Sequence, residues 1–171
     1  MPDSVWLIAL KSLDDDARAV KLGEVAELEL APGQQEFAGD PLRMMLVALQ
    51  EDSRFPYVVD SGGSAVGVLT LQRGAASLAG WTGDDSVWLL RGFLIDRNHQ
   101  GRGMGTLAAA AAVREAAKLT ARLGGGEAGV VLSVNERNPA GQAAYRKAGF
   151  EHRGQYLGGG AGAQRTMYRA F

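Results

Sequence analysis

Runs of large apolar residues, bounded by glycine, proline or polar residues, predict the strands of a sheet. Such runs lie at residues 5–11, 55–59, 65–72, 87–95 and 129–134, and two final strands are expected over about residues 151–157 and 164–171. The second and third runs are separated by a short glycine-bearing segment at residues 60–64, which is typical of a hairpin. The run at 87–95 is the longest, and a continuous hydrophobic stretch is typical of a strand buried on both faces. We therefore expect residues 87–95 at the centre of the sheet.

Capping residues and the helical spacing of apolar residues predict four helices, which begin near residues 17, 41, 103 and 139. The first follows three carboxylates at residues 14–16, where a helix N-terminus favours negative charge. Asp40 and Asn138 are each followed by proline, the usual order of a cap and a first helical residue. The stretch at 103–123 is rich in alanine, so this helix can lie close against a sheet. Residues 24–39 and the glycine tract at 158–162 are predicted loops, and the first could face a substrate or simply connect two helices.

The composition fits one globular domain spanning residues 1–171, because 46% of the residues are hydrophobic and 22% are charged. The formal net charge is -1, so the chain lacks the excess of basic residues that supports nucleic-acid binding. DNA and RNA are therefore not expected partners. The N-terminal apolar run lacks the basic lead of a signal peptide. No apolar run approaches the ~18 residues of a membrane span. We therefore expect a cytoplasmic protein without a membrane partner.

The chain contains no cysteine and only two histidines, His99 and His152. Disulfides, thiolate metal sites and a cysteine nucleophile are therefore excluded, and no metal centre is expected. His99 is interpreted as a surface residue. The remaining chemistry has to use oxygen groups, backbone amides and a bound cofactor.

Residues 95–105 join the predicted central strand to the alanine-rich helix through a glycine turn. The unpaired amides at a helix start, together with the helix dipole, favour an anion such as a phosphate. Glycine lets the backbone approach the phosphate oxygens closely. The same glycines could instead make only a tight turn that brings helix and sheet together, so this pattern alone leaves both interpretations open.

Two motifs in this sequence resemble signatures of the GNAT family of N-acetyltransferases. The first is Gln100-x-x-Gly103-x-Gly105 after the central strand, and the second runs from Asn138 through Tyr145 to the Gly-Phe pair at 149–150. The resemblance extends over about residues 5–170. It implies a single-domain α/β (α+β) fold, with a mixed central sheet of about six to seven strands flanked by about four helices. Gly141 stands where the family often has alanine, which can loosen the helix start by about 1 kcal/mol.

The resemblance also implies the residues that hold acetyl-CoA. The backbone of the central strand, at Phe93, Leu94 and Ile95, is implied to pair with the pantetheine arm. The turn is implied to bind the pyrophosphate through Gln100, Gly101, Arg102, Gly103, Met104 and Gly105. Asn135 and Asn138 match family positions that contact the cofactor, and Tyr145 matches the tyrosine that donates a proton to the leaving thiolate. Arg146 and Lys147 are further candidates for phosphate contacts.

The resemblance implies that the amine attacks the thioester directly, and the acceptor is expected to be a small-molecule primary amine. Residues 34–37 and 90–96 resemble the polyamine-acetylating branch, and four glutamates could attract a polycation: Glu24, Glu27, Glu29 and Glu36. An amino acid derivative, an antibiotic amine and a protein N-terminus remain open. The general base is also open among several carboxylates: Glu27, Glu29, Glu36, Asp84 and Asp85. The oligomeric state is open as well, although homodimers are common among similar proteins.

Two other functions remain open from the sequence. A dinucleotide-binding oxidoreductase is suggested by the loose G-x-G-x-x-A pattern at residues 103–108, but too few residues follow it for the remaining parallel strands. A CoA-binding regulatory or interaction module would keep the fold without turnover. The presence of Tyr145 argues against such a module, because a binding module needs no proton donor.

Overall fold

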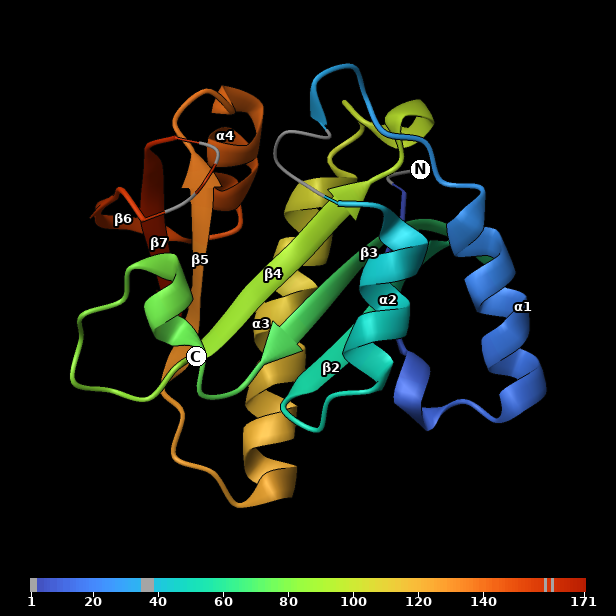
Figure 1. The fold of residues 1–171 in the computed structure, drawn as a ribbon, viewed down its shortest axis with the longest axis horizontal. Helices are drawn as coiled ribbons and strands as arrows, with labels where there is room; N and C mark the ends of the chain where they lie inside the picture. The colour runs from blue at the N-terminus through green and yellow to red at the C-terminus, as the bar shows by residue number, and fades with distance from the viewer. Residues whose placement is uncertain (1–2, 35–38, 159, 161) are drawn as a thin grey trace.

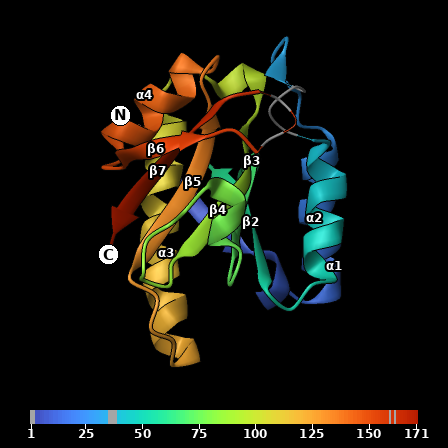
Figure 2. The ribbon, with the colours of Figure 1, turned by 60° about the vertical axis from the view of Figure 1, so that its left-hand side comes forward.

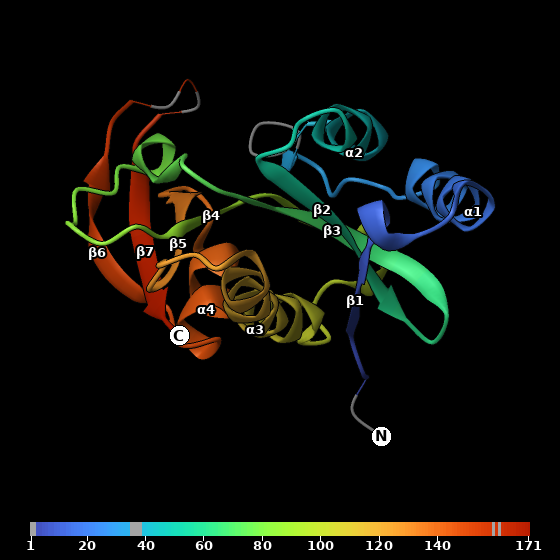
Figure 3. The ribbon, with the colours of Figure 1, turned by 90° about the horizontal axis from the view of Figure 1, so that it is seen from below.

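The computed structural model describes residues 3–34, 39–158, 160 and 162–171. In this part of the chain, seven strands form one sheet in the order β1-β2-β3-β4-β5-β7-β6. The strands are β1 (Trp6–Ala9), β2 (Arg54–Ser61), β3 (Ser64–Gln72), β4 (Trp88–Ile95), β5 (Gly129–Asn135), β6 (Glu151–Tyr156) and β7 (Gln164–Ala170). The α-helices are α1 (Asp15–Ala26), α2 (Pro41–Leu49), α3 (Met104–Leu123) and α4 (Pro139–Lys147). Helices α1 and α2 cover one face of the sheet, and α3 and α4 cover the other (Figures 1, 2 and 3).

The sheet is mixed, as predicted, and β4 occupies its central position. Only β4 and β5 pair in parallel, whereas the other neighbouring strands pair antiparallel. A dinucleotide-binding oxidoreductase would need several parallel strands, each followed by a crossover helix. The topology therefore matches the expected α/β fold and does not provide the sheet that an oxidoreductase would require.

Three predicted helix starts are capped by the side chains that the sequence indicated. Asp14 accepts a hydrogen bond from the Ala17 amide at 2.8 Å, and Asp40 accepts one from the Arg43 amide at 2.9 Å. Asn138 accepts one from the Gly141 amide at 3.0 Å. Each cap satisfies an amide that the first helical turn leaves unpaired.

The first strand and the first helix differ from their predicted bounds. A strand was expected over residues 5–11, but β1 ends at Ala9 and a short 3-10 helix, η1 (Leu10–Ser12), follows it. The Arg18 guanidinium of α1 donates to the Leu10 carbonyl at 2.9 Å and to the Leu13 carbonyl at 2.8 Å. Helix α1 extends beyond the predicted residues 17–22 to Ala26, because Leu22 and Val25 pack into the core beneath it.

The core has two layers that the central strand separates. Trp88 and Leu90 of β4 pack towards α3, whose alanines let the helix approach the sheet closely. Leu94 faces the opposite way and packs with Met45 of α2 and Val25 of α1. Among the helices of the described residues, none is both long and apolar enough to cross a membrane.

Candidate active site

The parallel ladder between β4 and β5 is short. It contains only the pairs Trp88–Val130 and Leu89–Val131, after which the strands diverge towards their C-terminal ends (Figure 1). A bulge in β4 accompanies the divergence, since Val68 pairs with Leu94 but Thr70 pairs with Arg91. Gly92 sits in the bulge with φ of 58°, a backbone conformation that glycine adopts without steric cost. The divergence leaves a wedge-shaped gap between the two strands.

A cavity of about 710 Å³ lies on the α3 and α4 side of this gap. Nine residues that the sequence predicted for the site line it: Phe93, Ile95, Gln100, Gly101, Gly103, Met104, Gly105, Asn138 and Tyr145. They come from β4, from the turn after it, from the first turn of α3, and from α4 with its cap. The two sequence motifs, far apart along the chain, therefore form one site.

The glycine turn presents free amides to this cavity. Gly101 and Gly103 have φ of 76° and 79°, and no side chain caps α3. The first helical hydrogen bond runs from the Leu107 amide to the Gly103 carbonyl at 3.1 Å. None of the amides from Gly101 to Thr106 donates to another described residue. Such an arrangement suits an anion, because unpaired amides and the positive end of the helix dipole meet at one place.

Hydrogen bonds of the Gln100 and Asp96 side chains hold the turn in place. The Gln100 side-chain amide donates to the Ile95 carbonyl at 2.9 Å and to the Gln34 side chain at 3.2 Å. The buried Asp96 carboxylate accepts hydrogen bonds from the Glu29 amide at 2.7 Å and from the Asn98 amide at 3.2 Å. These contacts fasten the turn to the loop that precedes α2.

Asp96 also lies 2.9 Å from Nδ1 of His99. Burial opposes ionisation of Asp96, but its hydrogen bonds from Glu29, His99 and Asn98 outweigh that effect and lower its pKa below the ordinary value. His99, interpreted from sequence as a surface residue, lines the cavity and remains about a third exposed. That interpretation missed the Asp96 contact, which holds the imidazole ring against the turn.

Tyr145 stands between two aromatic rings on the cavity wall. Its ring centroid lies 5.9 Å from that of Phe93 and 6.0 Å from that of Phe150. Its hydroxyl forms no hydrogen bond with a described residue. Burial raises the pKa of Tyr145 above its ordinary value, so the phenol keeps its proton at neutral pH. The arrangement fixes the ring and leaves the hydroxyl available to a bound molecule.

Three predicted residues lie away from the cavity lining. The Leu94 side chain packs in the core beneath α1 and α2, so only its backbone is near the gap. Asn135 is buried and accepts a hydrogen bond from the Arg137 amide at 2.9 Å. Arg102 points to the N-terminal segment, where it forms an ion pair with Asp3 at 3.0 Å. Arg146 is exposed, whereas Lys147 lines the cavity.

Sequence reasoning missed several residues of this cavity. Arg137 and Thr106 line it, as does the segment 31–34 from the loop before α2. The Thr106 hydroxyl donates to the Ala144 carbonyl at 3.3 Å and so connects α3 to α4. Arg137 lies between Asn135 and Asn138 in the second motif, and that position was the signal that could have identified it.

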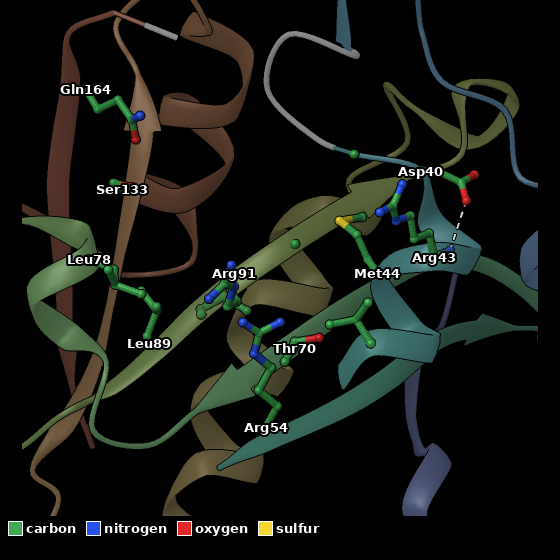
Figure 4. A pocket seen from close by; sticks show the side chains of 14 residues that line it. Asp40, Arg43, Met44, Arg54, Thr70, Leu78, Leu89, Arg91, Ser133 and Gln164 are labelled. Atoms are coloured by element: carbon green, nitrogen blue, oxygen red, sulfur yellow. Dashed lines mark hydrogen bonds between the residues drawn. The ribbon is translucent and has the colours of Figure 1, made fainter. Parts of the chain in front are cut away.

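A second cavity, of about 600 Å³, lies on the α2 side of the sheet. It reaches Gly92 and is bordered by α2, β2, β4 and β5 (Figure 4). Arg43, Arg54 and Arg91 line it, and among the described residues of either cavity Asp40 is the only carboxylate. None of the four described candidates for the general base, Glu27, Glu29, Asp84 and Asp85, lines either of these two cavities. The fifth candidate, Glu36, lies outside the described residues.

Two of the four glutamates expected to attract a polycation have other partners in the folded chain. Glu24 lies 2.9 Å from the Lys21 ammonium and also accepts a hydrogen bond from the Ala65 amide. Glu29 forms an ion pair with Arg97 at 3.1 Å. In the part of the chain that the structure describes, no cluster of three metal-ligating side chains occurs.

Comparison with known proteins identifies the family. The model of the acetyltransferase (GNAT) family matches residues 22–150, which is more than half of the chain. The chain therefore belongs to the GNAT acetyltransferases, as the two motifs predicted. A search of curated protein sequences finds no match.

Solved structures share the fold at low sequence identity. Aminoglycoside acetyltransferase AAC(6')-Ib, in complex with coenzyme A and kanamycin, is 17% identical with a TM-score of 0.62, and the match covers 98% of this chain and 94% of that one. Spermidine N-acetyltransferase from Vibrio cholerae, in complex with CoA and spermine, is 14% identical with a TM-score of 0.63 over 97% and 95% of the two chains. RimL, a ribosomal L7/L12 alpha-N-protein acetyltransferase in complex with coenzyme A, is 17% identical with a TM-score of 0.64 over 98% and 94%.

Proposed function

We propose that this chain transfers an acetyl group from acetyl-CoA to a primary amine of a small molecule, by direct attack within a ternary complex. The observation that carries this proposal is the gap between β4 and β5, with a cavity on each face of the sheet. Two substrates that enter from opposite faces can meet there without crossing the core. Membership of the acetyltransferase (GNAT) family supports the same reaction.

The cavity beside α3 fits coenzyme A. The unpaired amides of residues 101–106 suit a pyrophosphate, and Arg137 and Lys147 add positive charge at the cavity wall. Beyond Leu89 the edge of β4 has no ladder to β5, so its backbone is available to an extended pantetheine arm. The side-chain amide of Gln100 already occupies the Ile95 carbonyl. Among the predicted strand residues, the backbone of Phe93 and Leu94 is therefore the better candidate for this contact.

The chemistry requires a neutral amine and a proton donor. Acetyl-CoA supplies an activated thioester, and in the transfer a carbon–nitrogen bond forms while the carbon–sulfur bond breaks. Tyr145, with an unpaired hydroxyl and a raised pKa, is the proposed donor of a proton to the departing thiolate. The proton that the attacking amine releases passes to solvent, since the described cavity residues provide no unengaged carboxylate.

Two of the structural neighbours act on amines according to their descriptions, one on spermidine and one on aminoglycosides. These classes, together with the predicted polyamine branch, define a first acceptor panel. The experiment combines calorimetric titration with coenzyme A and thiol release from acetyl-CoA over that panel, extended to simple amines and to amines that carry a carboxylate or a phosphate. We expect binding of coenzyme A and release that depends on the amine. Binding without release for any amine would instead support a regulatory module, and stabilisation by NADH but not by acetyl-CoA would contradict the proposal.

A further inference from the structure

The cavity on the α2 side gathers three arginines from three different elements. Arg43 comes from α2, Arg54 from β2 and Arg91 from β4. Figure 4 shows the guanidinium groups of Arg54 and Arg91 side by side, with Arg43 across the cavity on α2. Strand pairing explains their proximity, because β3 alone separates β2 from β4. The cavity that we assign to the acceptor is therefore strongly positive.

Two of the three guanidinium groups lack a carboxylate partner among the described residues. Arg54 lies 2.9 Å from the Glu51 carboxylate, although without the alignment of a hydrogen bond. Arg91 donates to the neutral Gln72 side chain at 2.8 Å, and Arg43 forms no ion pair with any described residue. The carboxylate of Asp40 is already used as the cap of α2, where it binds the Arg43 amide.

The environment of Arg91 is unfavourable for its charge. Burial, and then the nearby charge of Arg54, lower the pKa of Arg91 below its ordinary value, while Glu51 acts in the opposite direction. A guanidinium stays protonated at any physiological pH, so this cost persists until an anion compensates it. Gln72 meanwhile holds the Arg91 side chain in one orientation.

We propose that the acceptor amine also carries an oxyanion, a carboxylate or a phosphate, which Arg91 and Arg43 bind. The inference rests on the proposed function, because it assumes that the amine enters from the α2 side. The planar fork of an arginine matches either group with two parallel hydrogen bonds. Arg91 directly precedes Gly92 at the gap, so an oxyanion bound to it places the rest of the acceptor beside the thioester position.

The same positive charge assists the reaction. Cations near an amine disfavour its ammonium form, and the neutral form is the nucleophile. A polyamine carries only positive charge and would meet repulsion from all three arginines. The cavity therefore favours an acceptor that carries a negative charge, which the arginines bind while its amine lies at the gap.

The test compares kcat/KM for matched acceptors that differ in the oxyanion. The pairs are 4-aminobutyrate with butylamine and phosphoethanolamine with ethanolamine, and spermidine represents polycations. We expect one oxyanion-bearing acceptor to exceed its partner by about tenfold or more, as charged hydrogen bonds provide. The pair that shows this preference identifies whether the bound oxyanion is a carboxylate or a phosphate. Equal rates within both pairs, or a preference for spermidine, would overturn the proposal.

Variants locate the effect. Arg91→Gln and Arg43→Gln should each lower kcat/KM for the preferred acceptor about tenfold, and should change kcat/KM for the partner that lacks the oxyanion less than about twofold. Arg43 is exposed, so its replacement does not threaten folding. Arg114→Gln, on the exposed face of α3, is the matched control and should change neither value. An equal loss for both members of a pair would show that the arginines act only structurally, against the proposal.

The two proposals fail in different ways. Every variant is first titrated with coenzyme A, which binds on the opposite face and should keep its affinity. If wild type binds no coenzyme A, the proposed function and this inference both fall. If wild type binds coenzyme A and acetylates butylamine as fast as 4-aminobutyrate, with the phosphate pair also equal, only the oxyanion inference falls.

Discussion

Gly92 and Phe93 are neighbours in the chain, yet they line different cavities. Gly92 borders the arginine-lined cavity under α2, and Phe93 borders the cavity under α4, where its ring contacts Tyr145. Adjacent residues of a strand point to opposite faces, and the bulge at Gly92 exposes this step at the gap. One peptide unit of β4 thus reaches from the cavity proposed for the acceptor to the cavity proposed for acetyl-CoA.

The bulge is therefore expected to matter for turnover. Replacing Gly92 with alanine places a Cβ at φ of 58° and within 3.4 Å of the Met44 sulfur. We expect Gly92→Ala to lower the free energy of unfolding by about 1–2 kcal/mol, the usual cost of a left-handed residue. We also expect at least a tenfold loss of kcat, because the gap between β4 and β5 would narrow or shift by tenths of an ångström. A tenfold loss corresponds to about 1.4 kcal/mol in the activation free energy.

Gly62→Ala is the matched control for Gly92→Ala. Gly62 lies in the turn between β2 and β3 with φ of 64°, and a Cβ there meets no atom within 4 Å. The control should show a similar loss of stability in chemical denaturation and an unchanged kcat. Equal kcat in both variants would show that the bulge has no part in catalysis.

Coenzyme A affinity should depend on the conformation of Gly103. This residue precedes α3 with φ of 79°, and its carbonyl accepts the first helical hydrogen bond. Gly103→Ala strains the turn and should weaken coenzyme A binding about tenfold in calorimetric titration. Gly124→Ala changes the other end of the same helix, where φ is 64°, and should leave the affinity unchanged. A parallel loss in both variants would point to destabilisation of α3 rather than to a phosphate site.

Tyr145→Phe isolates the proton donor. Removal of one hydroxyl keeps the contacts with Phe93 and Phe150, so coenzyme A affinity should stay within about twofold while kcat falls about a hundredfold. The raised pKa keeps the phenol protonated up to at least pH 10, so wild type should show no loss of activity from this group below that pH. Tyr156→Phe, on β6, is the control for a general loss of a tyrosine hydroxyl. Undiminished thiol release by Tyr145→Phe would remove this residue from the mechanism.

Local chemistry explains which parts of this molecule could be predicted from the sequence. The caps Asp14, Asp40 and Asn138 were predictable, because a cap depends on residues three positions apart. The central place of β4 followed from its continuous apolar run. The glycine turn and Tyr145 were found through motifs, and the structure brings both to one cavity.

The remaining features depend on contacts between distant segments. The bulge at Gly92 gives no local signal in a chain with 24 glycines, and it became visible only through the pairing with β3. The arginine cavity depends on the register of three strands, which places Arg54 and Arg91 on one face. Expectations from charge alone pointed instead to the glutamates, but Glu24 and Glu29 form ion pairs in the folded chain.

The Asp96 carboxylate should make the stability of the chain depend on pH through its contacts at the glycine turn. Its pKa is lowered in the folded chain, so it contributes stability above the unfolded pKa of about 3.9, and that stability is lost as pH falls through the folded pKa. Asp96→Asn removes the charge that holds the Glu29 amide and the His99 ring, and should cost about 1–3 kcal/mol at pH 7. The difference from wild type in chemical denaturation should shrink as pH falls below about 3.9 and through the lowered folded pKa, because wild-type Asp96 then also becomes neutral. Asp52→Asn, at an exposed turn, should show no such difference at either pH. If the difference in the free energy of unfolding between wild type and Asp96→Asn stayed constant down to pH 2, Asp96 would stabilise the turn through its shape and not through its charge.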